Sequence, residues 1–232
     1  MYIYGKNVAM EAIKKGEKIE KAYICNTFND KFLKSAIQNL KICTVFLTKN
    51  ELDKLAPKNH QGIILSVPDY KYSNIEKLLQ EDALIVMLDH IEDPHNLGAI
   101  IRTCEAAGVT GIIIPKDRCA TINPTVIKVS TGALANIDVC MVTNLNQAIE
   151  KLKKNGFWII GTDMEGDDYT KLDYKGKTCI VIGNEGNGLS KSVRENCDFI
   201  ASIKMKGKIN SLNASVATGI VVFEALKQRI GN

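Results

Sequence analysis

Three separate segments carry residue types suited to holding an anionic, nucleotide-like ligand beside a reacting centre. They are residues 89–108 (DHIEDPHNLGAIIRTCEAAG), 180–190 (IVIGNEGNGLS) and 203–219 (IKMKGKINSLNASVATG). Each joins an apolar, strand-like stretch to a turn rich in Gly, Asn or Ser, and the first and third then enter a helix. Glycines allow close backbone approach, and helix starts present free amide donors. We therefore expect the chemistry in these loops.

The first segment predicts a helix with a clear start and a clear buried side. Asp93 or Asn96 can cap it, and Pro94 is favoured at a first helical position. Helical spacing then predicts one buried stripe, formed by Leu97, Ile100, Ile101 and Cys104.

Arg102 is the only arginine in this segment. At about 100° per residue it projects roughly 140° from Leu97, away from the buried stripe. We expect Gly98, one turn earlier, to leave open space beneath the guanidinium. A guanidinium directed into a cleft can clamp a phosphate through its fork geometry. The alternative is an ordinary exposed arginine paired with Glu105.

The second segment places Gly183, Gly186 and Gly188 in a turn after a strand, with Glu185 as its one charged group. Glu185 is a candidate acceptor for a ribose hydroxyl or a base edge. The order G-x-x-G-x-G differs from the dinucleotide pattern G-x-G-x-x-G, which disfavours a nicotinamide-dependent dehydrogenase. By itself the motif is equally consistent with a tight surface turn.

In the third segment Ser211 and Asn213 precede the final helix, and either can cap it. A capped helix start still offers amide donors to a polar ligand. Three lysines alternate just upstream and can face phosphate: Lys204, Lys206 and Lys208.

His90 and His95 lie near several acidic residues, but their spacing fits no common zinc pattern. We therefore expect no metal.

The elements that position these loops fall into two groups. Residues 1–68 predict a small α/β domain, residues 69–80 a linker, and residues 81–232 a larger α/β domain. In the first domain we expect helices at 7–15, 31–39 and 51–55, and strands at 21–25, 44–47 and 63–67. In the second we expect strands at 83–88, 111–115, 137–142, 157–160, 179–183 and 199–203, and helices after residue 93, at 145–154 and at 213–229.

Apolar strands that alternate with helices imply a parallel sheet covered on both faces. Ligands bind at the carboxyl ends of the strands in such sheets, where the three loops would lie.

The composition is that of a globular, reduced protein. Seven cysteines are widely spaced without a CxxC pair, which indicates free thiols. No apolar run approaches the roughly 20 residues of a membrane span, and the start of the chain lacks a secretory pattern. We expect a cytoplasmic protein with no membrane partner. Residues 1–70 hold 11 lysines and 7 acidic residues, and the rest holds 19 charges of each sign. Lysine attracts phosphates, although a solvated surface explains this excess equally well.

Taken together, DPHNLGAIIRTCEAAG, GNEGNGLS and IKMKGKINSLNASVA resemble motifs 1, 2 and 3 of the SpoU/TrmH family of S-adenosylmethionine-dependent RNA ribose 2′-O-methyltransferases. The three occur in the family's order over residues 83–232. The stretch INPTVIKVSTGALANIDVCMVTNL, with GKNVAMEAI and HQGI nearer the start, is similar to the branch that methylates a guanosine in the peptidyl-transferase loop of 23S rRNA.

This resemblance implies an α/β-knot (SPOUT) domain with a deep C-terminal trefoil knot, preceded by a ribosomal-protein-like substrate-binding domain. It implies S-adenosylmethionine as cofactor, 23S rRNA as the RNA partner, and a homodimer in which the partner chain completes each site. The implied catalytic and RNA-positioning residues are Asn96, Arg102, Glu185, Ser211 and Asn213. The implied cofactor contacts are Gly183, Ile203 and Leu212, with Thr131, Gly132, Gly161, Asn184, Gly186 and Ser215 near the pocket.

Two other functions remain open. The first is a ribose methyltransferase that acts on tRNA, and the second is an RNA-binding protein that keeps the fold without catalysis. Intact Arg102, Glu185 and the SLN triplet of residues 211–213 favour an enzyme.

Overall fold

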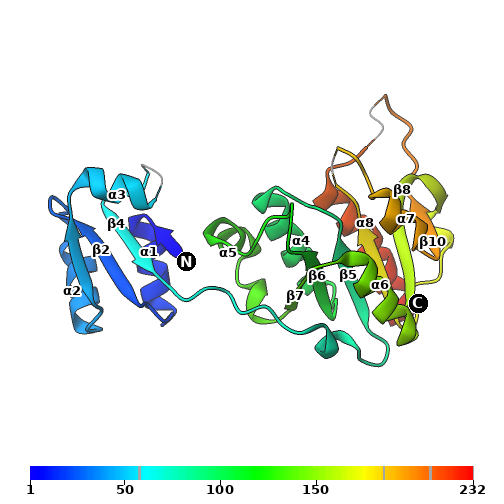
Figure 1. Cartoon of the computed structure of the whole chain (residues 1–232), viewed down its shortest axis with the longest axis horizontal. Helices are drawn as coiled ribbons and strands as arrows, with labels where there is room; N and C mark the ends of the chain where they lie inside the picture. The colour runs from blue at the N-terminus through cyan, green and yellow to red at the C-terminus, as the bar shows by residue number, and fades with distance from the viewer. Residues whose placement is uncertain (57–58, 185, 209–210, 232) are drawn as a thin grey trace. The chain divides into compact units, whose positions relative to one another are not determined.

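A computed structural model describes residues 1–56, 59–184, 186–208 and 211–231. The chain divides into two compact units, an N-terminal unit of Met1–Lys71 and a C-terminal unit of Tyr72–Asn232 (Figure 1).

The N-terminal unit is a four-stranded sheet with helices. Its strand order is β1-β4-β2-β3, with β2 and β3 parallel and the other pairs antiparallel. The strand at residues 2–4 was not predicted, because three residues show no usable alternation. The elements are β1 (Tyr2–Tyr4), α1 (Lys6–Lys14), β2 (Lys21–Cys25), α2 (Lys31–Asn39), β3 (Thr44–Leu47), α3 (Lys49–Leu55) and β4 (Ile63–Ser66).

The C-terminal unit is a six-stranded sheet in which every pair of strands is parallel, in the order β10-β8-β9-β5-β6-β7. The predicted parallel sheet is confirmed. Its strands are β5 (Leu84–Leu88), β6 (Gly111–Pro115), β7 (Asp138–Val142), β8 (Trp158–Asp168), β9 (Thr178–Ile182) and β10 (Phe199–Ser202). Its α-helices are α4 (Pro94–Ala106), α5 (Pro124–Ser130), α6 (Leu145–Lys154), α7 (Lys191–Glu195) and α8 (Ala214–Ile230), and single 3-10 turns are η1 (Ile75–Leu78), η2 (Ala133–Ala135) and η3 (Tyr169–Lys171).

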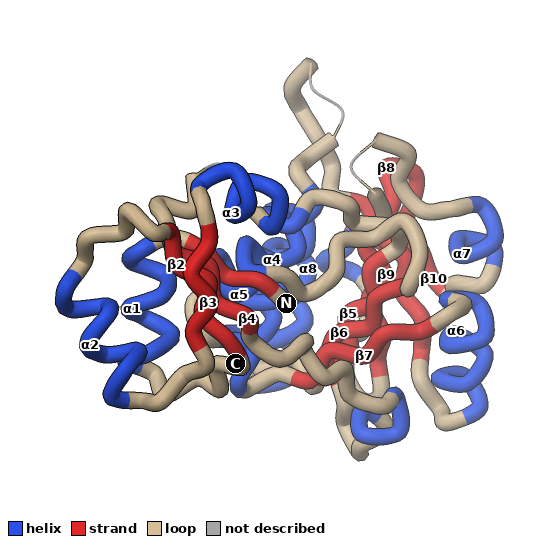
Figure 2. The backbone as a smooth tube through the Cα atoms, turned by 60° about the vertical axis from the view of Figure 1, so that its left-hand side comes forward, coloured by secondary structure: helices blue, strands red, loops and turns tan. Residues whose placement is uncertain are grey.

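Both faces of this sheet are covered, so its central strands are apolar throughout. Every residue of β5, β6 and β9 is buried. Side chains alternate between the faces, and one set packs with α6 and α7 in a single core cluster that includes Met87, Ile149 and Val193. The other face meets α4 and α8, which contact each other. Figure 2 shows the two helix pairs on opposite sides of the strands.

Two α-helices and one strand of this unit differ from expectation by more than their end residues, and the three 3-10 turns were not predicted either. Two short helices, α5 and α7, were not predicted, since five to seven residues give little periodic signal. Asn123 and Pro124 nevertheless give α5 a cap and a first position of the usual types. Strand β8 continues to Asp168, well past the predicted end at residue 160, through polar residues that lack any apolar alternation.

Candidate functional site

A cavity of about 750 Å³ opens at the carboxyl edge of the sheet, where the second and third loops meet the extended end of β8. A volume of this size accommodates a nucleoside-sized ligand. Its described lining comes from three parts of the chain: residues 162–166, residues 182–184 with 186–188, and residues 201–205, 207, 211, 212, 214 and 217. The predicted site residues among its lining are Gly183, Asn184, Gly186, Ile203, Ser211 and Leu212.

Gly183 has to be glycine because the loop folds tightly back on it. A Cβ at this position would lie 2.4 Å from the carbonyl carbon of Gly188. Asn184 and Gly188 exchange two backbone hydrogen bonds of 2.9 Å, which close the turn. The Asn184 side chain accepts from the amide of Gly186 at 2.9 Å and donates to the carbonyl of His90 at 2.7 Å. The backbone of Gly183, Asn184 and Gly188 thus forms a tight turn, here called the glycine cradle, which a side chain at position 183 would fill. Glu185 lies outside the described residues.

Asp89, at the end of β5, holds the far end of this loop and was missed as a positioning group. Its side chain is 1% exposed, and it accepts a hydrogen bond of 2.6 Å from the amide of Ser190. Its other oxygen lies 2.5 Å from Nδ1 of His90, a residue with a φ of 63°. From the sequence, the acidic residues near His90, Asp89 among them, were considered as metal ligands or helix caps. A carboxylate directly after a buried strand was the available signal.

The starts of α4 and α8 come together beside the cavity. Asp93 caps α4 with Pro94 following, as predicted, and Asn213 caps α8. The Asn213 amide donates to Oδ1 of Asn96 at 2.9 Å. Ser215 donates to Oδ1 of Asn213 at 2.6 Å. The structure therefore joins three of the predicted residues, Asn96, Asn213 and Ser215, in one hydrogen-bonded group.

Arg102 is exposed on α4, on the side away from the buried stripe. The predicted stripe of Leu97, Ile100, Ile101 and Cys104 is fully buried. Arg102 does not line the cavity. Glu105 accepts a hydrogen bond of 3.0 Å from Asn136, and within the described part of the chain no ion pair joins it to Arg102.

The expected space beneath Arg102 does not exist. A Cβ on Gly98 would lie 2.7 Å from Cβ of Val129, so this glycine lets α5 pack against α4. The contact joins residues far apart in sequence, which is why spacing along one helix could not reveal it.

Three other predicted cofactor residues lie outside the cavity lining, as Ser215 does. Thr131 (φ 49°) and Gly132 (φ 91°) form the left-handed turn that ends α5. Gly161 is buried, and a Cβ there would lie 2.7 Å from Cδ1 of Leu189. Packing thus accounts for glycine at position 161, and the role of these residues toward a cofactor stays a prediction.

The segment 162–166 is the part of the site that sequence reasoning missed. Its five residues, Thr162 to Gly166, all line the cavity. The motif TDMEG carries two acids and no apolar alternation, so only its position after a strand could have drawn attention to it.

Within the described ranges, no group of three or more His, Cys, Asp or Glu side chains could hold a metal ion. Among the same residues, no helix has the length and apolar character needed to cross a bilayer.

Comparisons with known proteins agree with this architecture. Residues 83–223 match the SpoU rRNA Methylase family, and residues 2–73 match a domain described as RNA 2′-O ribose methyltransferase substrate binding. A protein of Staphylococcus saprophyticus, named as a TrmH family tRNA/rRNA methyltransferase, is 41% identical over 98% of this chain and 95% of its own length.

Solved structures share the fold. The SpoU methyltransferase AviRb of Streptomyces viridochromogenes, in complex with AdoMet, superposes with a TM-score of 0.78 at 27% identity, covering 99% of this chain and 90% of its own. A TrmH/SpoU tRNA modifying enzyme of A. aeolicus is 34% identical with a TM-score of 0.60, covering 67% of this chain and 81% of its own.

These matches confirm the predicted fold class, an α/β-knot domain with a parallel sheet that follows a small α/β substrate-binding domain. The cavity and its glycine cradle fit the predicted cofactor in size and in backbone donors. The chain belongs to the SpoU/TrmH family of S-adenosylmethionine-dependent RNA 2′-O-ribose methyltransferases.

Proposed function

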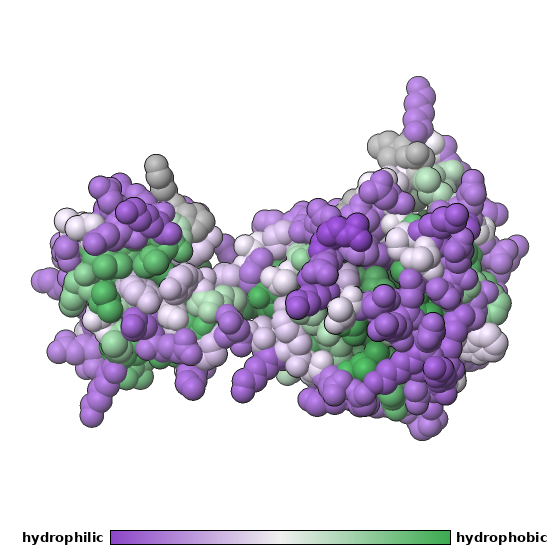
Figure 3. Space-filling view, viewed as in Figure 1, coloured by the Kyte–Doolittle hydropathy of each residue, from purple (hydrophilic) through white to green (hydrophobic). Residues whose placement is uncertain are grey.

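We propose that this chain methylates the ribose 2′-oxygen of a guanosine in the peptidyl-transferase loop of 23S rRNA. The observation that carries the proposal is the cavity at the sheet edge, bordered by the hydrogen-bonded Asn96 and Asn213. A separate lysine-rich N-terminal unit matches a substrate-binding family and supports a large RNA target. Figure 3 shows hydrophilic side chains over much of the visible face of that unit, around an apolar patch.

Cofactor binding in this proposal uses mostly backbone groups. Gly183, Ile203 and Leu212 would hold S-adenosylmethionine in the cavity, where the Gly183–Gly188 turn and the residues before α8 supply donors and carbonyls. When bound, the cofactor supplies an electrophilic methyl group on sulfur. The protein's part is orientation and electrostatics.

Arg102 would act through its charge in the transfer step. A guanidinium stays protonated near neutral pH and is a poor base. Arg102 would hold the phosphate next to the target ribose and stabilise the developing alkoxide, while phosphate or solvent takes the proton. Asn96, Ser211 and Asn213 would orient the ribose.

We also propose a homodimer whose partner chain completes each site. Arg102 lies outside the lining of its own chain's cavity. Helix α8 exposes Val216, Phe223 and Ile230 at intervals of seven residues, and their side chains are 49%, 48% and 72% exposed. Seven residues make about two helical turns, so the three share one apolar side.

We also propose a cytoplasmic location. The cytoplasm contains RNA and the reducing pool that keeps thiols free, and the cysteines of the chain are free.

The test uses the purified full chain, labelled S-adenosylmethionine, and transcripts of the 23S peptidyl-transferase region and of tRNA. We expect methyl transfer to the rRNA transcript, mapped by mass spectrometry to one guanosine 2′-oxygen. Methyl transfer to tRNA alone would show that tRNA is the substrate. The A. aeolicus relative is named as a tRNA modifying enzyme. RNA binding without cofactor binding in calorimetry would indicate the non-catalytic alternative.

A further inference from the structure

The cavity wall at residues 162–166 is a stretch of β8 that has left the sheet. Strand β8 pairs with β9 only as far as Gly161. Its pairing with β10 passes from Ile200–Gly161 directly to Ala201–Asp167, so residues 162–166 have no ladder partner on either side. The same five residues line the cavity. Side chains therefore have to hold this wall in place.

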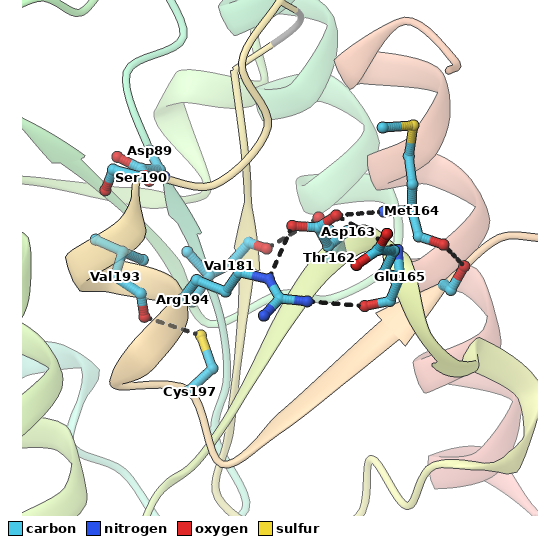
Figure 4. A network of polar contacts seen from close by, with 11 residues as sticks. Asp89, Thr162, Asp163, Met164, Glu165, Val181, Ser190, Val193, Arg194 and Cys197 are labelled. Carbon is cyan, nitrogen blue, oxygen red and sulfur yellow. Dashed lines mark hydrogen bonds and ion pairs between the residues drawn. The ribbon is translucent and has the colours of Figure 1, made fainter. Parts of the chain in front are cut away.

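Arg194 on helix α7 supplies two of the contacts that hold it (Figure 4). Its Nε donates to Oδ2 of Asp163 at 3.1 Å, and its Nη2 donates to the main-chain carbonyl of Glu165 at 3.1 Å. Oδ1 of Asp163 accepts from the amide of Met164 at 2.6 Å. The guanidinium and the carboxylate thus fix three consecutive residues of the wall.

Two hydroxyl groups hold the first and the middle residue of the same segment. Thr162 donates to the carbonyl of Val181 at 3.0 Å, and Ser202 donates to the carbonyl of Met164 at 2.8 Å. Arg194 is the only one of these groups that reaches the wall from a helix outside the sheet, and it contacts both Asp163 and Glu165. Neither contact involves the adjacent glycine loop.

The Arg194–Asp163 pair is too exposed to be a main source of global stability. The two side chains are 42% and 21% exposed, and exposed ion pairs contribute little to folding. A fork that binds a carboxylate and a carbonyl at once is well suited to local order, because a planar guanidinium loses little freedom per hydrogen bond. Ordering a cavity wall before the ligand arrives increases affinity by reducing the entropy lost on binding.

We propose that Arg194 is a positioning residue for the cofactor, which preforms the 162–166 wall through Asp163 and the Glu165 carbonyl. This inference rests on the proposed assignment of the cavity to S-adenosylmethionine. Arg194 acts on KM and Kd for the cofactor and leaves the transfer step and RNA binding alone.

The test compares full-length wild type with Arg194→Ala, Arg194→Lys and Asp163→Asn. Lys191→Ala is the matched control, a cation on the same helix that is 91% exposed and pairs only with Glu195 in the described structure. Calorimetry gives the Kd for S-adenosylmethionine, and steady-state assays give KM for cofactor and RNA and kcat at saturating cofactor. Hydrogen exchange reports on the peptide that covers residues 162–166.

Arg194→Ala is expected to raise Kd and KM for the cofactor about tenfold, with kcat and the KM for RNA within about twofold of wild type. Arg194→Lys should recover part of the affinity, since one ammonium cannot reproduce the fork. Asp163→Asn should change the cofactor Kd and KM in the same way as Arg194→Ala. In both variants, hydrogen exchange at residues 162–166 without cofactor should be faster than in wild type. Lys191→Ala should match wild type.

An unchanged cofactor Kd in Arg194→Ala overturns the inference. A lower kcat, a higher KM for both cofactor and RNA, and a lower melting temperature, all in the same variant, would also overturn it, because they would show a merely structural residue. If wild type itself fails to bind S-adenosylmethionine, the assignment of the cavity fails instead, so the two failures are distinguishable.

Discussion

Arg102 is the side chain on which the proposed transfer step depends most directly. We expect Arg102→Ala to lower kcat by about 100-fold or more, the usual effect of removing a group that stabilises a developing oxyanion. The Kd for S-adenosylmethionine should stay within about twofold, because Arg102 does not line the cavity. Calorimetry and single-turnover assays separate the two quantities. Arg102→Lys keeps the charge and loses the fork, so its kcat should lie between those of wild type and Arg102→Ala. Near-full activity of the alanine variant would remove Arg102 from the mechanism.

A thiol partly buried in the core, that of Cys197, makes the fold less stable at alkaline pH. Burial raises the pKa of Cys197 from 9.0 to about 11. The folded state therefore keeps this thiol protonated in a range where the unfolded state ionises it. The stabilisation is complete below about pH 9 and is lost as the pH rises toward 11.

We expect the free energy of unfolding in urea to fall between pH 9 and pH 10, with Cys197 contributing at most about 1 kcal/mol. Cys197→Ala should flatten this part of the profile. Cys43→Ala, which removes an exposed thiol, should leave the slope unchanged. Equal slopes in wild type and Cys197→Ala would contradict the assignment.

At the scale of elements, the turn between β9 and α7 offers two glycines with different constraints. A Cβ at Gly183 would lie 2.4 Å from the backbone of Gly188, whereas a Cβ at Gly186 would meet only Oδ1 of Asn184 at 3.5 Å. We expect Gly183→Ala to displace the turn, to cost about 1–3 kcal/mol of stability, and to weaken cofactor binding. Gly186 lines the same cavity, but a Cβ there displaces nothing, so Gly186→Ala is the matched control for stability and should have the free energy of unfolding of wild type. A cofactor Kd for Gly183→Ala equal to that of wild type would show that the cradle is not part of the binding site.

Elements with a complete local pattern were predicted to the residue, among them β2, β3 and α6. Their apolar spacing lies within the element, and a cap such as Asn144 marks the start of α6. Helix α7 was missed because five residues carry little periodic signal, and the extension of β8 was missed because its contacts lie outside the local sequence. Residues 162–166 are held by Arg194 and Ser202, about 30 and 40 positions away along the chain.

At the scale of the whole molecule, the proposed homodimer is tested directly by measuring the oligomeric state. Phe223→Glu places a charge in the apolar side of α8 and should convert a dimer into a monomer in light scattering, with loss of activity, since burying an unpaired charge is costly. Phe199→Glu is the control, because Phe199 is similarly exposed (43% against 48%) and lies on the edge strand β10 beside Trp158. A monomeric wild type would refute the dimer, and equal effects of the two variants would refute this interface.

The sequence by itself determined the parallel sheet, the convergence of the loops after β9 and β10 at one edge, and two candidate caps for each of α4 and α8. Alternating apolar strands and helices imply parallel strands whose carboxyl ends share one edge, and candidate caps are read from the few residues before each helix. Only the tertiary structure decided that Asp89 binds Ser190, that Gly98 accommodates Val129, and that Arg102 stays outside its own cavity. Each depends on which distant side chains meet after the helices pack on the sheet, and no spacing along one segment encodes that contact.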